Sequence, residues 1–166
     1  MQLLSTKRLV IQRVTLGDAP FLLELMNDKD WIQNIGDRGI RSVKEAEEYI
    51  TSKFLKSYAE DKIGFYGIVL KETGEMIGTA GLIDRDGLDH VDIGYGFLPA
   101  YRGKGYALEA TKAIYDYGYD QLGLDKIVAI VNSDNTDSIK LLKKLGLRFE
   151  KMVRLPDEEQ DIKLFS

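Results

Sequence analysis

The sequence has 166 residues, of which 44% are hydrophobic and 30% are charged. These proportions are typical of soluble domains, and the length favours a single domain over residues 1–166. The absence of cysteine excludes disulfides, thiolate metal sites and a cysteine nucleophile, and the single histidine, His90, excludes a multi-histidine metal centre. We therefore expect no metal. The net charge of −4 argues against a nucleic-acid partner.

No segment has the pattern of a targeting or membrane-spanning sequence. The first 14 residues contain three basic side chains and no long apolar stretch. We therefore expect neither a signal peptide nor a membrane span there or elsewhere. The sequence favours a cytoplasmic protein with no membrane partner.

The amino-terminal part of the chain is expected to contain a strand, a short helix and a long loop. Alternating apolar residues predict a strand over 6–14. Apolar residues at helical spacing follow a cap at Thr15 or Asp18 and predict the helix. Residues 27–41 are polar, contain glycine and have no period. Because such a segment is long for a connector, it indicates a functional loop.

The rest of the chain alternates between strands and helices. Ser42 and Glu45 have the spacing of a capping box and precede a second helix that is expected to end near Glu60. Three antiparallel strands are then predicted over 65–70, 76–83 and 91–98. The remaining elements are a helix over 106–122, a strand over 126–131, a short helix after Asn135, and a hairpin over 147–155 and 162–165. This order predicts an α+β (mixed α/β) fold with one strand–helix–strand crossover in a mainly antiparallel sheet.

The crossover begins with a glycine-rich loop, Arg102-Gly103-Lys104-Gly105. Such a loop exposes backbone N–H groups at the positive end of a helix dipole, where phosphate binds without a metal. The loop is not a Walker loop, since Leu98 stands where the first glycine should be, and it is not a dinucleotide fingerprint, since residue 108 is leucine. It matches instead the pattern [Gln/Arg]-x-x-Gly-x-[Gly/Ala] over 102–107. The structural alternative is an ordinary left-handed turn.

Several further segments fit the same family as this loop. They are Thr6-Lys7-Arg8-Leu9, Thr15, Asp18, residues 93–107, Asn132, Asn135, Ser138 and residues 145–147. On these residues the chain resembles the GNAT superfamily of acetyl-CoA-dependent N-acetyltransferases, and within it the ribosomal-protein N-terminal acetyltransferases. The resemblance implies a twisted, mostly antiparallel sheet of six to seven strands with one parallel, splayed pair, flanked by about four helices.

The resemblance also implies where acetyl-CoA binds. The splayed pair would be 91–98 and 126–132, and unpaired backbone groups of Phe97 and Leu98 would receive the pantetheine arm. An unpaired strand edge can accept an amide-containing ligand by strand addition. One of the two N–H groups, of Phe97 or Leu98, would polarise the thioester oxygen. Gly94 and Gly96 either leave room for a ligand or mark a kinked strand.

The pyrophosphate of the cofactor is expected at the glycine-rich loop. The N–H groups that would cradle it belong to Gly103, Lys104, Gly105, Tyr106 and Ala107. Arg102 and Lys104 would add positive charge. Asn132 and Asn135 resemble the asparagines of the family that contact the cofactor, and the alternative for Asn135 is a simple helix cap.

Acetyl transfer requires a neutral amine and protonation of the leaving thiolate. Without a cysteine intermediate, we expect direct attack in a ternary complex. Many relatives use a tyrosine as the acid, but Leu142 stands at the position aligned with it. Ser138 resembles the thiolate acid of the ribosomal-protein branch; alternatively, it is only a first-turn neighbour of the cap.

The general base is predicted to be Asp92 or His90. Alternation places both on the strand face of Gly94 and Gly96. The alternative for His90 is a solvated surface position, and the alternative for Asp92 is a cross-strand pair.

The acceptor is expected beneath the loop over 27–41. Trp31, Asp28, Asp30 and Asp37 would read a cationic amine, or else serve as a packing anchor and a solvated acidic face. The primary expectation is a protein N-terminal amine. The alternatives are a small amine, such as a polyamine, an amino sugar or an antibiotic, and a catalytically silent acyl-CoA-binding domain. The terminal hairpin is compatible with a homodimer, although no residue pattern specifies one.

Overall fold

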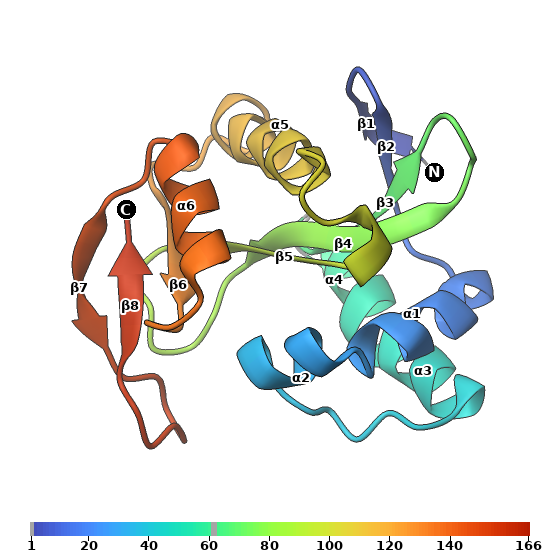
Figure 1. The fold of residues 1–166 in the computed structure, drawn as a ribbon, viewed down its shortest axis with the longest axis horizontal. Helices are drawn as coiled ribbons and strands as arrows, with labels where there is room; N and C mark the ends of the chain where they lie inside the picture. Colours follow the sequence, from blue (N-terminus) through green and yellow to red (C-terminus); the bar gives the residue numbers. More distant parts are fainter. Residues whose placement is uncertain (1, 61–62) are drawn as a thin grey trace.

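The sheet has eight strands, and helices cover both of its faces (Figure 1). The computed structural model describes residues 2–60 and 63–166. In spatial order the strands are β1 (Gln2–Ser5), β2 (Leu9–Gln12), β3 (Phe65–Leu70), β4 (Met76–Ile83), β5 (Val91–Phe97), β6 (Ile127–Val131), β8 (Ile162–Phe165) and β7 (Phe149–Val153). All neighbours are antiparallel except β5 and β6. The predicted mixed α/β fold with one parallel pair is confirmed, but the sheet is larger than the expected six to seven strands.

The additional strand is β1 (Gln2–Ser5), which precedes the strand predicted over 6–14, whereas that predicted strand contains β2 (Leu9–Gln12). The Thr6 N–H donates to the Leu9 carbonyl at 2.9 Å, and the Leu9 N–H donates to the Thr6 hydroxyl at 3.1 Å. These bonds close a turn between the strands. Leu9 and Ile11 of β2 are fully buried, whereas β1 is a partly exposed edge strand. Alternation alone does not reveal this turn, because apolar residues continue on both sides of it.

The described residues form five α-helical segments, where about four helices were expected. They are α1 (Ala19–Met26), α2 (Lys29–Asn34), α3 (Val43–Tyr49) continued by a π-helical segment at Ile50–Leu55 and by α4 (Lys56–Glu60), α5 (Tyr106–Asp120) and α6 (Thr136–Lys144). Helix α2 lies within the predicted loop over 27–41. The Asp28 carboxylate caps α2 by accepting from the Trp31 N–H at 3.2 Å. A helix of six residues is too short to show a period in the sequence.

The parallel pair separates soon after it begins. Val91 pairs with Ile127 and Asp92 with Val128, but β5 continues unpaired on this side to Phe97. Strand β6 pairs instead with β8. Helices α5 and α6 lie on one side of the sheet, and α1, α2 and α3 lie on the other (Figure 1). The predicted splayed pair is thus present, with helices on both sides of the opening.

Tyr58 connects helix α4 to the sheet. Its hydroxyl donates to the Phe65 carbonyl and accepts from the Val14 N–H at 3.1 Å, and its ring stacks on Tyr66 with centroids 5.2 Å apart. Burial raises the pKa of Tyr58, so the hydroxyl stays protonated and can donate throughout the neutral range.

We predict that Tyr58→Phe lowers the free energy of unfolding by about 1–3 kcal/mol, because a buried N–H and a carbonyl lose their partner. Urea unfolding measures the change. Tyr49→Phe is the control, since the Tyr49 hydroxyl makes no hydrogen bond within the described residues. Equal stability of the two variants would contradict this assignment.

Candidate active site

The open edge of β5 presents one of the two predicted N–H groups, that of Phe97. The Leu98 N–H donates to the Ile77 carbonyl at 3.1 Å, so it faces β4. Because backbone groups alternate along a strand, the N–H and carbonyl of Phe97 face the opening between β5 and β6. The Phe97 carbonyl accepts from Arg102 Nε at 3.0 Å. Two N–H groups were predicted as contacts of the thioester oxygen. The geometry leaves the Phe97 N–H available for this contact and does not support the Leu98 N–H.

The glycine-rich loop has the backbone geometry that a phosphate site requires. Gly103 and Gly105 have φ angles of +74° and +84°, in the left-handed region. Gly105 directly precedes α5, whose first N–H groups have no partner within the helix. A Cβ on Gly103 would meet no atom within 4 Å, so the loop is open to an approaching ligand. These features fit a pyrophosphate site, and they are also those of a left-handed turn. The loop is therefore compatible with both interpretations.

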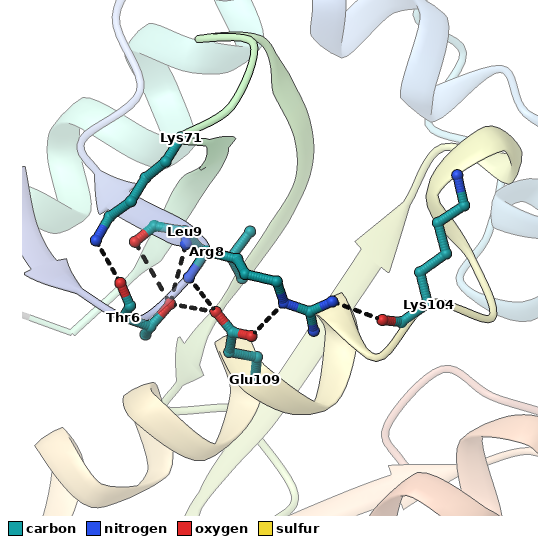
Figure 2. A network of polar contacts seen from close by, with 6 residues as sticks. All are labelled: Thr6, Arg8, Leu9, Lys71, Lys104 and Glu109. Carbon is teal, nitrogen blue, oxygen red and sulfur yellow. Dashed lines mark hydrogen bonds and ion pairs between the residues drawn. The ribbon is translucent and has the colours of Figure 1, made fainter.

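Arg8, near the amino terminus, contacts the glycine-rich loop (Figure 2). Its Nη1 donates to the Lys104 carbonyl at 2.9 Å, and its Nε pairs with Glu109 Oε1 at 2.7 Å. The Arg8 N–H and the Thr6 hydroxyl both donate to Glu109 Oε2, at 2.9 and 2.6 Å. The Arg8 guanidinium also lies over the Tyr106 ring, 4.4 Å from its centroid. The sequence offered Thr6 and Arg8 only as part of a family resemblance, without this role.

The network stabilises the charged form of Glu109. Burial by itself would raise the pKa of Glu109, but the hydrogen bonds from Thr6 and Arg8 outweigh it and hold the pKa below its usual value. A lowered folded-state pKa contributes stability above the pKa of the unfolded chain, near 4.3. This contribution disappears as the pH falls through the folded-state pKa.

We predict that Glu109→Gln reduces the acid sensitivity of folding. The free energy of unfolding of the wild type should fall more steeply below about pH 4.3 than that of the variant. Urea unfolding at a series of pH values measures both slopes. Parallel slopes would show that Glu109 does not couple folding to pH.

We also predict that Arg8→Ala raises the dissociation constant of coenzyme A about tenfold, because the Lys104 carbonyl and Glu109 lose a charged partner that fixes the loop. Calorimetric titration with coenzyme A measures the affinity. Arg13→Ala is the control, since the Arg13 guanidinium lies over the Tyr58 ring instead. Equal affinities of the two variants would remove Arg8 from the binding loop.

Arg102 binds protein groups on the opposite side of the sheet from α5. In addition to the Phe97 carbonyl, its guanidinium pairs with Asp28 at 2.6 Å and with Asp30. Burial opposes ionisation of Asp28, but bonds from Arg102 and the Trp31 N–H lower its pKa on balance. The prediction that the Arg102 side chain adds charge at the pyrophosphate is therefore not supported, because two carboxylates of the α2 region already hold it. Lys104 is exposed and free of such an ion pair within the described residues.

Ser138 is joined to a residue that the sequence did not suggest. The Tyr95 hydroxyl donates to Ser138 Oγ at 2.8 Å, which connects β5 to the first turn of α6. Burial raises the pKa of Tyr95. Leu142, one turn later in α6, is 2% exposed and apolar. Alternation along β5 places the Tyr95 side chain on the face opposite to that of Gly94 and Gly96. This alternation is the one feature of the sequence that could have drawn attention to Tyr95.

The two predicted asparagines have side-chain partners in the protein. Asn135 Oδ1 accepts from the Ser138 N–H at 3.2 Å, so Asn135 caps α6. Asn132 Nδ2 donates to the Asn34 carbonyl at 3.3 Å, which connects the end of β6 to the end of α2. The helix-cap alternative for Asn135 therefore holds. Each amide keeps one further polar atom for a ligand.

The structure does not bring Asp92 or His90 to Phe97. Asp92 is 1% exposed, pairs with Arg85 at 3.1 Å and lies in the ladder where β5 still pairs with β6. Five residues of strand separate it from Phe97, about 16 Å. Burial raises the pKa of Asp92 despite Arg85, and His90 is exposed before β5 begins. This geometry matches the structural alternatives and gives neither residue the place of a base.

Trp31 covers β5 on the side of α2. A Cβ on Gly96 would lie only 2.3 Å from Trp31 Cζ3, and a Cβ on Gly94 would lie 3.1 Å from Phe65 Cζ. Both glycines are therefore needed for close approach of aromatic rings. The Trp31 ring packs on Gly96, the residue before Phe97 in β5.

Comparison with known proteins identifies the family. Residues 8–148 match the acetyltransferase (GNAT) domain. The chain belongs to this family. It is an acetyl-CoA-dependent N-acetyltransferase, and the open strand edge, the glycine-rich loop and Ser138 all lie within the matched residues.

Relatives with different named acceptors resemble this enzyme. The uncharacterized N-acetyltransferase p20 of Bacillus licheniformis is 33% identical over 157 residues, which cover 93% of this chain and 86% of p20. The spermidine N(1)-acetyltransferase of Escherichia coli K12 is 37% identical over 75 residues, which cover 43% of this chain and 40% of that protein. The ribosomal-protein-S5-alanine acetyltransferase of Vibrio fischeri superposes with a TM-score of 0.79 over 98% of this chain and 93% of its own, at 16% identity, and shows the shared fold.

Two further properties concern residues 2–60 and 63–166. No helix there is long and apolar enough to cross a membrane. No group of three or more histidine, cysteine, aspartate or glutamate side chains in that part of the chain is arranged to hold a metal ion.

Proposed function

We propose that this enzyme acetylates the α-amino group of a protein N-terminus, by direct attack of the amine on acetyl-CoA in a ternary complex. The choice of acceptor rests on the ion pairs of the acidic residues around α2. Asp28 and Asp30 pair with Arg102, and Asp37 pairs with Arg41 at 2.6 Å. All three carboxylates expected to read a cationic acceptor are neutralised within the chain.

A polyamine is the second candidate acceptor. It is favoured by the similarity to the spermidine acetyltransferase over 75 residues. However, a polyamine carries several ammonium groups, and each ammonium that is removed from water needs an anionic or polar partner. A protein N-terminus presents a single amine and continues as an uncharged backbone. The paired acids therefore suit an N-terminus better than a polyamine.

The chain contributes binding and orientation to the reaction. When bound, acetyl-CoA supplies an acetyl group activated as a thioester. Backbone N–H groups from Gly103 to Ala107 would hold its pyrophosphate, with Lys104 adding charge and the remaining amide atoms of Asn132 and Asn135 as further contacts. The Phe97 N–H would stabilise the negative charge that develops on the carbonyl oxygen.

Ser138 and Tyr95 would provide the proton for the leaving group. As the C–N bond forms and the C–S bond breaks, Ser138 donates its hydroxyl proton to the sulfur and receives the Tyr95 proton in turn. The surplus proton of the amine passes to solvent, from which Tyr95 is reprotonated. Burial raises the pKa of Tyr95 above that of a free phenol, but a phenol is still a better match to a thiol, whose pKa is near 8.5, than a serine alone. Tyr95 would thus supply the phenol proton that Leu142, at the position aligned with the tyrosine acid of many relatives, cannot supply.

The proposed acceptor is tested with a panel of amines. Peptides with free α-amino groups, the same peptides with blocked N-termini, spermidine and an amino sugar are incubated with acetyl-CoA, and the products are identified by mass spectrometry. We expect acetylation of the free peptides at the α-nitrogen. Acetylation of spermidine or the sugar without the peptides would overturn the proposal.

The proposed relay predicts similar defects in two variants. Ser138→Ala and Tyr95→Phe should each lower kcat about a hundredfold and change the affinity for coenzyme A little. The double variant should be no worse than Ser138→Ala, because the residues act as a unit. Steady-state kinetics measure kcat, and Tyr115→Phe on α5 is the control. If Tyr95→Phe alone keeps full kcat, Ser138 acts without Tyr95.

A further inference from the structure

Two residues that meet at Gly96 of β5 each carry a buried polar atom without a hydrogen-bond partner. Within the described residues, Trp31 Nε1 and Thr79 Oγ1 are the buried side-chain atoms that lack one. The six-membered ring of Trp31 lies against Gly96, and Thr79 pairs with Gly96 across the sheet. Folded proteins pair the great majority of their buried polar groups, so two unpaired groups in adjacent side chains indicate a missing partner.

The strand register places Thr79 next to the tryptophan ring. Thr79 of β4 lies directly opposite Gly96 of β5, so their side-chain directions share one face of the sheet, with Cβ positions about 5 Å apart. Trp31 Cζ3 and Cε3 occupy the position of the missing Gly96 Cβ, at 2.3 and 2.5 Å from it. The ring of Trp31 therefore lies beside the Thr79 side chain.

Glycines explain why Thr79 finds no partner within the sheet. Its neighbour on β3 is Gly67, and its neighbour on β5 is Gly96. Neither has a side chain that can reach the hydroxyl. Thr79 itself is only 1% exposed, so bulk water does not satisfy it.

The hydrogen-bonding capacity of the two unpaired groups indicates which ligand they can bind. An indole N–H only donates, whereas a threonine hydroxyl both donates and accepts. A ligand that offers a carbonyl acceptor close to an N–H donor satisfies both groups. A protein N-terminus offers both within its first residue, since the α-amine is followed by a peptide carbonyl. The ammonium groups of a polyamine only donate, so a polyamine would leave the Trp31 N–H unpaired.

We propose that Trp31 and Thr79 form the acceptor subsite and recognise the first residue of a protein N-terminus. Trp31 Nε1 donates to the first peptide carbonyl, and Thr79 Oγ1 accepts from the neutral α-amine. The second bond leaves the nitrogen lone pair free to face the acetyl carbon beside Phe97. The inference rests on the proposed function. It adds the two residues that select an N-terminal amine.

Entry of the acceptor must displace the Trp31 ring, because the ring covers Thr79. Trp31 is the single tryptophan of the chain. Its fluorescence, excited selectively over tyrosine, therefore reports this subsite without turnover. With coenzyme A present in place of acetyl-CoA, a tripeptide with a free α-amine should shift the emission saturably. Spermidine at the same concentration should not.

Variants at Thr79 test the contact directly. Thr79→Val preserves the shape of the side chain and should raise the tripeptide dissociation constant about tenfold, whereas Thr79→Ser should retain the wild-type value. Trp31→Phe keeps an aromatic ring and should raise the KM for the tripeptide about tenfold, with unchanged calorimetric affinity for coenzyme A.

Thermal unfolding distinguishes a ligand site from a site for structural water. If the Thr79 hydroxyl is unpaired in the free enzyme, Thr79→Val should unfold at the same or a higher temperature. Thr111→Val is the matched control, because the buried Thr111 hydroxyl donates to the Ala107 carbonyl at 2.7 Å. The control should unfold at a lower temperature and bind the tripeptide normally. If Thr79→Val is destabilised and binds the tripeptide like the wild type, the hydroxyl holds a structural water and the inference is overturned.

Failure of the inference differs from failure of the proposed function. If the wild type acetylates tripeptides, and Trp31→Phe and Thr79→Val keep its KM, only the subsite is wrong. If the wild type acetylates spermidine and no tripeptide, the proposed acceptor is wrong, and the subsite with it.

Discussion

The separation of β5 from β6 after two paired residues is the constraint on which the site depends. A parallel strand that loses its neighbour inside a fold exposes a row of N–H and carbonyl groups that need other partners. Phe97 stands at the open end of this row, while the Leu98 N–H pairs with β4 on the other side. The glycine-rich loop, Ser138 and Trp31 all lie around the same opening.

Two arginines join distant parts of the chain to this opening. Arg8 connects the amino-terminal hairpin to the start of α5, and Arg102 connects α2 to the carbonyl of Phe97. Each guanidinium binds a carboxylate and a backbone carbonyl together, which suits its fixed, planar set of donors. The glycine-rich loop and helix α2, on opposite sides of the sheet, are thereby held relative to one strand end.

Some features of the site were within reach of sequence analysis, and others were not. The glycine-rich loop is local, since the φ angles of Gly103 and Gly105 follow from glycine itself, and its position before a helix was predicted. The partners of Arg102 and Asp92 were not predictable, because a long or a buried charged side chain pairs with whatever carboxylate or guanidinium the fold brings near. Tyr95 was overlooked because its partner Ser138 is 43 positions away.

The sequence by itself determined the order of the strands and helices apart from β1 and α2, the single crossover and the glycine-rich loop before α5, because periodicity, caps and glycine turns act over a few residues. It also excluded cysteine and multi-histidine chemistry outright. Only the tertiary structure decided which N–H of β5 faces the opening, that Asp28, Asp30 and Asp37 are paired with arginines, and that Trp31 and Thr79 meet at Gly96. Those properties depend on strand register and on contacts between residues far apart in the chain, and no local pattern encodes either.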